Sequence, residues 1–374
     1  METNLKTVNP LQTPLKGVMT VPSDKSISHR AAMFSALTGK EVQITNFSLG
    51  GDCKSTLGIL EKLGVEANFT SKNNLTIVNN GFRAPNGVLD AGNSGTTMRL
   101  MSGILAGTDF TSTITGDESL RKRPMARIIN PLKEMGAIIQ AEENDTKAPI
   151  TITGTNLKGI TYNSKVASAQ VKSCILLAGL NAEGETVVVE PEKSRDHTER
   201  MLGYLGADIK VDGNRVSIRK CQLEPKPLSI PGDISSAAFF IVAASIIPGS
   251  EIIIKNVGLN PTRTGILDVL WEMGADIEIL DKNTVCNEEV GDLKVRYSDL
   301  KGVEIRGGMI PAVIDELPII AIAATQAQGE TVVGEAEELR HKESDRIKAI
   351  CAELKKLGAS IEEAIDGFVI EGKT

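Results

Sequence analysis

The sequence predicts an α/β protein built from about five repeated units, each with the element order β-α-β-α-β-β. The main observation is the phrase Leu/Met-Gly-Ala/Val, which recurs five times in 374 residues at intervals of 68 to 84 residues. Each copy follows an apolar run with helical spacing and precedes an alternating, strand-like run. Such a period is too long for an ordinary solenoid, and each unit is too small to bury its own core, so the units should pack against one another. The repeated glycines are Gly64, Gly136, Gly206, Gly274 and Gly358.

The copy that ends at Gly274 shows the order of elements most clearly. Its first helix follows an Asp/Ser start signal, and its second closes at glycine, the residue type that helix C-termini favour. A Pro-Gly turn and a β-branched run lie between them, and two more strand-like runs follow. The expected elements are helices at 231–246 and 262–273 and strands at 251–255, 275–280 and 293–296.

The copies around Gly64, Gly206 and Gly358 predict the same order. Strand-like runs open them (EVQITNF, ETVVVE and ETVVG), and two further such runs close each one. One glycine at a helix end carries little information, but five at near-constant spacing indicate a repeat. The second helices of these copies are expected at 53–63, 197–205 and 343–357.

Composition restricts the class of protein. Apolar residues make up 41% of the chain and charged residues 24%, which is typical of a soluble globular protein, and the length predicts two to three domains. A net charge of −7 and only 3% aromatic residues argue against a nucleic-acid partner. No apolar stretch has membrane-spanning length, and the N-terminus lacks a signal-peptide pattern. Five scattered cysteines indicate free thiols in a cytoplasmic protein, and three isolated histidines argue against a zinc site.

Two places predict a passage between domains. Three prolines fall within nine residues at 223–231 (LEPKPLSIP), where they interrupt two repeats. A second crossing is possible near 19–22.

Polar and cationic residues gather at predicted helix starts, where free N–H groups and the helix dipole favour anions. The segment 22–30 (PSDKSISHR) offers Lys25, Ser26 and Arg30, although a capped, solvent-facing first turn is an alternative, and His29 fits a structural hydrogen bond better than catalysis. Similar starts occur at 90–100 (DAGNSGTTMRL), with Asn93, Ser94 and Thr96, at 168–173 (SAQVKS), and at 194–200 (SRDHTER), with Arg195. In the run Arg121, Lys122 and Arg123, one or two side chains are expected in a site and the rest in solvent.

The candidates for acid–base chemistry lie in two later segments. Asp315 and Glu316 precede a nearly uncharged helix, so each is either an N-cap or a general base. Lys342, Glu343 and Arg346 stand at helical spacing, which a solvated helix face explains equally well. Six such segments together favour chemistry between small anions. The Walker A and G-x-G-x-x-G motifs are absent, so ATP and NAD have no evident binding site.

These segments, in this order, closely resemble the 5-enolpyruvylshikimate-3-phosphate synthase family. The resemblance runs from about residue 15 to about residue 372 and rests on PSDKSISHR, GNSGTTMR, SLRKRPM, SAQVKS, RDHTE, PGDISSAAF, NPTRTGI, IDELPI and KESDRI. The related UDP-N-acetylglucosamine enolpyruvyl transferases carry a reactive cysteine in the loop that aligns with 107–123, and this chain has none there. They remain the second candidate, and a non-catalytic anion-binding protein is the third.

The resemblance implies a two-domain enolpyruvyl transferase fold, an inside-out α/β barrel with three βαβαββ units in each domain. The first domain would hold residues 1–20 and 228–374, and the second would hold 21–227. Because only five units are found, we expect the chain to be a fragment that lacks the sixth, C-terminal unit. Family members carry an Asp-His-Arg segment and a lysine there for phosphoenolpyruvate, so shikimate 3-phosphate binding should survive better than catalysis.

The resemblance also implies the reaction of phosphoenolpyruvate with shikimate 3-phosphate, in a cytoplasmic monomer without cofactor or metal. Asp315, with Lys342 beside it, would accept the proton of the attacking 5-hydroxyl, and Glu343, helped by Lys25, would protonate the methylene carbon. Glyphosate would compete with phosphoenolpyruvate, since Gly95 adds no methyl group to that pocket. The implied ligands of shikimate 3-phosphate are Lys25, Ser26, Arg30, Ser168, Ala169, Gln170, Arg195, Asp315 and Lys342; those of phosphoenolpyruvate are Lys25, Asn93, Gly95, Arg123, Gln170 and Arg346.

Overall fold

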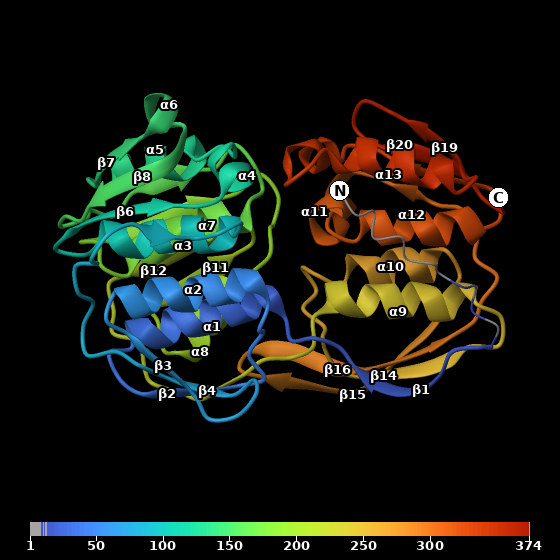
Figure 1. Cartoon of the computed structure of the whole chain (residues 1–374), viewed down its shortest axis with the longest axis horizontal. Helices are drawn as coiled ribbons and strands as arrows, with labels where there is room; N and C mark the ends of the chain where they lie inside the picture. Colours follow the sequence, from blue (N-terminus) through green and yellow to red (C-terminus); the bar gives the residue numbers. More distant parts are fainter. Residues whose placement is uncertain (1–8, 10, 12, 374) are drawn as a thin grey trace, which may run out of the picture.

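The computed structural model describes residues 9, 11 and 13–373, which form two lobes lying side by side (Figure 1). The first lobe holds residues 22–230, and the second holds residues 13–21 together with 231–373. Each lobe has its own buried apolar core: one runs from Ile27 to Ile230, and the other joins Val21 to residues from Ile234 to Ile370. We propose that the lobes are the two predicted domains. The first lobe corresponds to the predicted second domain, and the second lobe corresponds to the predicted first domain. The chain passes from one core to the other at 231–233.

The α/β architecture is confirmed, and each predicted unit contributes one four-stranded mixed sheet. In every sheet an edge strand runs parallel to its neighbour, and the other two strands are antiparallel. The first lobe has the orders β13(Leu228–Ser229)-β2(Val42–Thr45)-β4(Leu75–Val78)-β3(Glu66–Phe69), β5(Leu89–Asp90)-β6(Thr111–Thr115)-β8(Lys147–Thr153)-β7(Ile138–Ala141) and β9(Thr161–Asn163)-β10(Glu185–Val189)-β12(Arg215–Arg219)-β11(Ile209–Asp212). The second lobe has β1(Lys16–Thr20)-β14(Glu251–Gly258)-β16(Glu288–Arg296)-β15(Asp276–Val285) and β17(Glu304–Ile305)-β18(Glu330–Val333)-β20(Phe368–Glu371)-β19(Ser360–Glu363).

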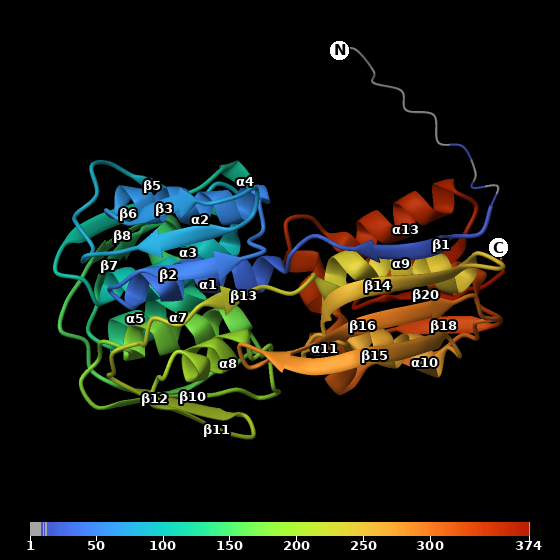
Figure 2. The same cartoon turned by 90° about the horizontal axis from the view of Figure 1, so that it is seen from below.

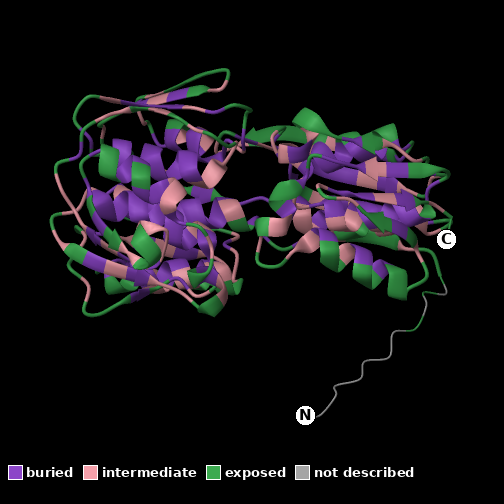
Figure 3. Ribbon diagram, turned by 90° about the horizontal axis from the view of Figure 1, so that it is seen from above, coloured by how far each residue is buried: buried purple, intermediate pink, exposed green. Residues whose placement is uncertain are grey.

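Most helices of the first lobe lie inside it and its sheets lie outside (Figures 1 and 3). In the first lobe the helices are α1(Lys25–Leu37), α2(Gly51–Lys62), α3(Gly95–Ala106), α4(Glu118–Arg121), α5(Ala126–Glu134), α6(Glu142–Asp145), α7(Ala169–Gly179) and α8(His197–Tyr204). In the second they are α9(Ile234–Ile246), α10(Gly265–Glu272), η1(Gly307–Met309), α11(Ile310–Val313), α12(Leu317–Gln326), η2(Glu337–His341) and α13(Arg346–Lys356).

Two central helices of the first lobe, α3 and α7, pack backbone against backbone. A Cβ at Gly103 of α3 would lie 2.2 Å from the carbonyl oxygen of Cys174 on α7, so only glycine allows this approach. Both helices are buried over most of their length, which agrees with their apolar composition.

The repeated glycines end helices, as predicted. Each stands just after the end of a helix with φ between +82° and +100°, a left-handed conformation that glycine adopts without a Cβ penalty. The turn at each glycine directs the chain from the helix into the next strand of the outer sheet.

The first strands of two units are exchanged between the lobes. β1 precedes α1 in the chain, but it pairs with β14 of the second lobe, while β13 supplies the parallel edge strand beside β2 of the first lobe (Figure 2). The chain therefore passes between the lobes twice. The two crossings are hydrogen-bonded to each other, from the N–H of Asp24 to the carbonyl of Pro231 and from the N–H of Asp233 to the carbonyl of Pro22, both at 2.8 Å.

Several element boundaries differ from those expected. α13 begins at Arg346 rather than at 343, because the Asp345 carboxylate accepts the N–H of Lys348 (3.0 Å) and caps the helix there. Lys342 and Glu343 therefore lie in a loop, and the alternative in which they share a solvated helix face with Arg346 is wrong. β15 and β16 are longer than predicted, because a tight turn with positive φ at Cys286 and Asn287 joins them.

Within the described residues, no single helix combines the length and apolar character needed to cross a membrane. Only the segments Gly307–Val313 and Leu317–Gln326 together reach that length and composition, and they are bent by 109° at the break between them.

Candidate active site

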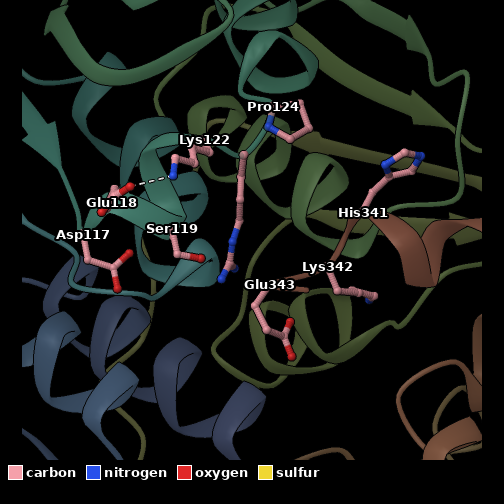
Figure 4. A pocket seen from close by; sticks show the side chains of 9 residues that line it. Asp117, Glu118, Ser119, Lys122, Pro124, His341, Lys342 and Glu343 are labelled. Atoms are coloured by element: carbon pink, nitrogen blue, oxygen red, sulfur yellow. Dashed lines mark hydrogen bonds and ion pairs between the residues drawn. The ribbon is translucent and has the colours of Figure 1, made fainter. Parts of the chain in front are cut away.

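Three of the predicted site residues, Arg123, Lys342 and Glu343, line one cavity between the two lobes. This cavity of about 670 Å³ opens between α4 of the first lobe and the loop that precedes α13 of the second. Figure 4 shows Asp117, Glu118, Ser119 and Lys122 on one side of the cavity and His341, Lys342 and Glu343 on the other. The residues lining it are Asp117, Glu118, Ser119, Lys122, Arg123, Pro124, His341, Lys342 and Glu343.

The Asp315 carboxylate forms ion pairs with cationic side chains of both lobes. Its carboxylate lies 2.5 Å from Arg195 Nη2 of the first lobe and 3.4 Å from both Lys342 Nζ and Arg346 Nη1 of the second. Burial alone would raise the pKa of Asp315, but the cations of Arg195 and Lys342 outweigh it and hold the pKa well below the ordinary value. Asp315 is therefore a carboxylate at neutral pH, able to accept a proton once those cations turn to another anion.

Lys25 and Arg30 lie on α1 but differ in exposure. Lys25 remains about half exposed and pairs with Asp52, Nζ to Oδ2, at 3.2 Å. Arg30 is only 3% exposed, and its guanidinium donates to Thr198 Oγ1 (2.7 Å), Ser173 Oγ (3.0 Å) and the carbonyl of Ser26 (2.9 Å). Lys25 is thus free to move toward a ligand, whereas Arg30 is held in a fixed orientation.

Asn93 and Arg123 meet at the start of α3. Arg123 Nη2 donates to Asn93 Oδ1, and Asn93 Nδ2 donates to Asp117 Oδ2, both at 2.6 Å. Lys122 forms an exposed ion pair with Glu118 at the edge of the cavity, and Arg121 is not among the residues that line it. This agrees with the expectation that only part of the run at 121–123 faces the site.

Arg99 belongs to this cluster but was missed in the sequence. It is 7% exposed, donates to Gln170 Oε1 and to the carbonyl of Pro124 (3.2 Å), and lies beside Gly95, where an added Cβ would be 2.9 Å from its Nη1. Gln170 in turn donates to Thr96 Oγ1 at 3.0 Å. Burial and the nearby guanidiniums lower the pKa of Arg99 to about 10. Its position one helical turn after Gly95 was the signal that could have identified it.

Glu343 and Arg346 are paired with each other in this structure. Arg346 donates to Glu343 Oε1 from Nη2 (2.5 Å) and Nε (3.1 Å). Burial would raise the pKa of Glu343, but hydrogen bonds, including that from Arg346, lower it overall. To act as a proton donor, Glu343 must first lose this partner.

Glu316 is neither an exposed cap nor a neighbour of the cavity. It is 1% exposed, accepts a hydrogen bond from Ser235 and lies 3.8 Å from Arg263 Nη2, and its side chain makes no capping bond. Arg263, also missed in the sequence, lies between Glu316 and the two carboxylates that cap α1 and α9, Asp24 and Asp233. This buried cluster joins both chain crossings to the residue that follows Asp315.

His29 is a structural hydrogen-bonder, as expected. It is fully buried, and its Nδ1 lies 2.7 Å from Thr56 Oγ1. Burial and the neighbouring Lys25 lower the pKa of His29 to about 3, so the ring is neutral.

The profile of one protein family, EPSP synthase (3-phosphoshikimate 1-carboxyvinyltransferase), matches residues 11–374. The chain is 53% identical to the 3-phosphoshikimate 1-carboxyvinyltransferase of Bacillus licheniformis over 364 residues, which cover 96% of this chain and 85% of that protein. It is 55% identical to the enzyme of the same name from Petrotoga mobilis, with the same coverage. Among solved structures, an EPSP synthase from Acinetobacter baumannii is similar with a TM-score of 0.88 and 46% identity, covering 97% of this chain and 83% of that one. The chain belongs to the EPSP synthase family.

Proposed function

We propose that this chain transfers the enolpyruvyl group of phosphoenolpyruvate to the 5-hydroxyl of shikimate 3-phosphate and releases phosphate. The observation that supports this most directly is the convergence of Arg195, Lys342 and Arg346 on Asp315 from two lobes. Both substrates are anions, and each would bring carboxylate or phosphate oxygens that suit guanidinium and ammonium groups.

Shikimate 3-phosphate is proposed to bind at the starts of α1 and α7 and at Arg195. The N–H groups and the positive dipole end at a helix start favour a phosphate. Arg30, held by three hydrogen bonds, would supply a fixed charge, whereas Lys25 would turn from Asp52 to the ligand. The proposed ligands are Lys25, Ser26, Arg30, Ser168, Ala169, Gln170, Arg195, Asp315 and Lys342.

Phosphoenolpyruvate is proposed to bind between the start of α3 and the loop before α13. Arg123 and Arg346 face this space from opposite lobes, and each now pairs with a group of its own lobe, Asn93 and Glu343. The substrate would replace those partners and draw the lobes together. The proposed ligands are Lys25, Asn93, Gly95, Arg123, Gln170 and Arg346.

The chemistry would be an addition followed by an elimination. Asp315 accepts the proton of the 5-hydroxyl while the hydroxyl oxygen forms a bond to the central carbon of phosphoenolpyruvate. Glu343 donates a proton to the methylene carbon. The tetrahedral intermediate then loses phosphate and a methyl proton, which restores the double bond. Substrate anions that draw Arg195 and Lys342 from Asp315, and Arg346 from Glu343, would raise the pKa of both carboxyls toward values suited to these roles.

Phosphate release on mixing both substrates tests the proposal. We expect release by the unaltered chain and its loss in Asp315→Asn and Lys25→Ala, while Asp299→Asn, an exposed carboxylate of the second lobe, keeps the activity. Binding of shikimate 3-phosphate without phosphate release would favour the non-catalytic alternative. Product formation with UDP-N-acetylglucosamine instead would favour the other enolpyruvyl transferase.

Glyphosate is proposed to compete with phosphoenolpyruvate, because Gly95 leaves room between Arg99 and Arg123. Inhibition that needs glyphosate far in excess of phosphoenolpyruvate would contradict this. We also propose a cytoplasmic monomer; the five free cysteines support a reducing compartment, and light scattering would measure the mass.

A further inference from the structure

A buried ion cluster lies directly beneath the two segments proposed to bind shikimate 3-phosphate. Lys172, in the first turns of α7, is 1% exposed, and its Nζ lies 2.7 Å from both Glu190 Oε2 and Glu199 Oε1. The three residues come from α7, from the end of β10 and from α8. None reaches the cavity between the lobes, and the proposed reaction uses none of them.

Glu190 contacts the backbone of both binding segments. Its Oε1 accepts the N–H of Ser168 at 3.2 Å and the hydroxyl of Ser194 at 2.6 Å, and its Oε2 accepts the N–H of Ser194 at 3.4 Å. Ser168 begins the segment 168–170, and Ser194 directly precedes Arg195. One carboxylate therefore sets the distance between the start of α7 and the residue that donates to Asp315.

Lys172 strengthens the same connection. Besides its two ion pairs, its Nζ donates to the carbonyl of Ser194 at 3.4 Å. Both polar groups of the Ser194 backbone are thus held by the Lys172–Glu190 pair. Lys172 is the single charged residue of α7.

Glu199 has a different position in the cluster. Only its Oε1 reaches Lys172, and its buried Oε2 has no hydrogen-bond partner among the described residues. Two carboxyls share one ammonium, and burial raises the pKa of Glu199. A glutamine at 199 would keep the contact with Lys172 through its amide oxygen. A glutamine at 190 would have to turn its NH2 group toward groups that now donate to Glu190, either the Ser168 N–H and the Ser194 hydroxyl or the Ser194 N–H and Lys172 Nζ.

We infer that Lys172 and Glu190 are positioning residues, which hold the segment 168–170 and Arg195 at the separation that shikimate 3-phosphate requires. The inference rests on the proposed function. It assigns these residues no contact with the substrate. Their loss should weaken binding of shikimate 3-phosphate more than binding of phosphoenolpyruvate. Gln170 is the one proposed phosphoenolpyruvate ligand in the segment 168–170, whereas Arg123 and Arg346 lie on other elements.

The experiment compares Glu190→Gln, Lys172→Met and Glu199→Gln in the full chain, by calorimetric binding of shikimate 3-phosphate and by the KM for each substrate. Ile152→Ala on β8, in the core of the same lobe, controls for lost stability, and the melting temperature of every variant is recorded. We expect Glu190→Gln and Lys172→Met to weaken shikimate 3-phosphate binding by about tenfold or more, since small displacements of positioning groups are costly. The KM for phosphoenolpyruvate should change much less, and Glu199→Gln should have a smaller effect than Glu190→Gln.

If Glu190→Gln folds and binds shikimate 3-phosphate like Ile152→Ala at a similar melting temperature, the cluster is only structural and the inference is wrong. Equal increases in both KM values would also contradict it. If Lys172→Met fails to fold, the comparison of Glu190→Gln with Glu199→Gln tests the inference by itself: equal binding of shikimate 3-phosphate in the two variants would contradict it. Failure of the unaltered chain to bind shikimate 3-phosphate would overturn the proposed function as well, so the two failures are distinguishable.

Discussion

Replacing Arg263 by methionine should lower the free energy of unfolding by about 3–5 kcal/mol at neutral pH, the usual loss when one partner of a buried ion pair is removed. The guanidinium is buried with 4% of its side chain exposed. Its nitrogens lie 3.4 Å from Asp233, 3.8 Å from Glu316 and 4.0 Å from Asp24. Methionine would fill most of the volume but leave these carboxyls without a cation.

The magnitude follows from the geometry. At an effective dielectric constant of about 20, opposite unit charges 4 Å apart attract by about 4 kcal/mol. Several such attractions act on Arg263, and the cost of removing its charge from water offsets part of them, which makes a net loss of about 3–5 kcal/mol reasonable. For a cooperative unit of about 150–250 residues, this corresponds to a decrease in melting temperature of about 6–20 °C.

The loss should depend on pH. Burial raises the pKa of Asp233 and that of Glu316 even with Arg263 present, whereas for Asp24 burial acts to raise the pKa but Arg263 and other groups lower it overall. Without Arg263, the pKa of each carboxyl would rise, and all three would lie above their unfolded values. These groups then take up protons as the pH falls, and the cost of burying their charges disappears. The gap in melting temperature between variant and unaltered chain should therefore be widest at pH 7.5 and narrower at pH 5.

Thermal unfolding followed by circular dichroism at both pH values tests this. Arg219→Met is the matched control, since that side chain is 59% exposed and forms a surface pair with Glu185, so its melting temperature should change by less than about 2 °C. A shift that small for Arg263→Met at pH 7.5, or a gap at pH 5 as wide as at pH 7.5, would refute the reasoning.

Three further outcomes are expected. Burial raises the pKa of Cys53 to about 12, so iodoacetamide at pH 8 should leave it unmodified in the folded protein while the half-buried Cys286 reacts, as peptide mass spectrometry would show. Burial and Lys25 lower the pKa of His29 to about 3. Below pH 6.5 the unfolded chain therefore binds a proton at His29 that the folded chain does not bind. This difference lowers the free energy of unfolding by up to about 1.4 kcal/mol for each pH unit. In denaturant titrations from pH 7 to pH 5, the free energy of unfolding should decrease less steeply with falling pH in His29→Gln than in the unaltered chain. An equal dependence on pH in both would contradict this prediction. Gly95→Ala would place a methyl group 2.9 Å from Arg99 and should raise the KM for phosphoenolpyruvate and the inhibition constant for glyphosate by about tenfold. Unchanged constants would show that the pocket lies elsewhere.

The repeat could be predicted because its signals are local. A glycine that ends a helix with positive φ, as Gly64 and Gly274 do, needs no distant contact to act, and strand alternation is equally local. The helix starts that carry Lys25 and Ser168 were recognised for the same reason. The boundary at 343 was wrong because a second local signal, the cap at Asp345, competed with the apolar periodicity.

The buried cations could not be interpreted in this way. Lys172 and Arg263 stand in segments where a cation is ordinarily assigned to solvent, and their carboxylate partners lie up to 239 residues away, as for Arg263 and Asp24. A single sequence does not reveal which distant residues will form such pairs. Arg99 is an intermediate case, since its helical spacing from Gly95 was visible but its contact with Gln170 was not.

The sequence alone therefore determined the α/β class, the five units, the elements that begin and end at local signals, and the cationic helix starts, because each depends on residues within a few turns of one another. Only the tertiary structure decided the exchange of β1 and β13 between lobes, the meeting of Arg195 with Asp315, and the buried clusters around Lys172 and Arg263. These features depend on which segments pack together after the chain has crossed twice. That packing is stabilised by contacts between residues far apart in the sequence.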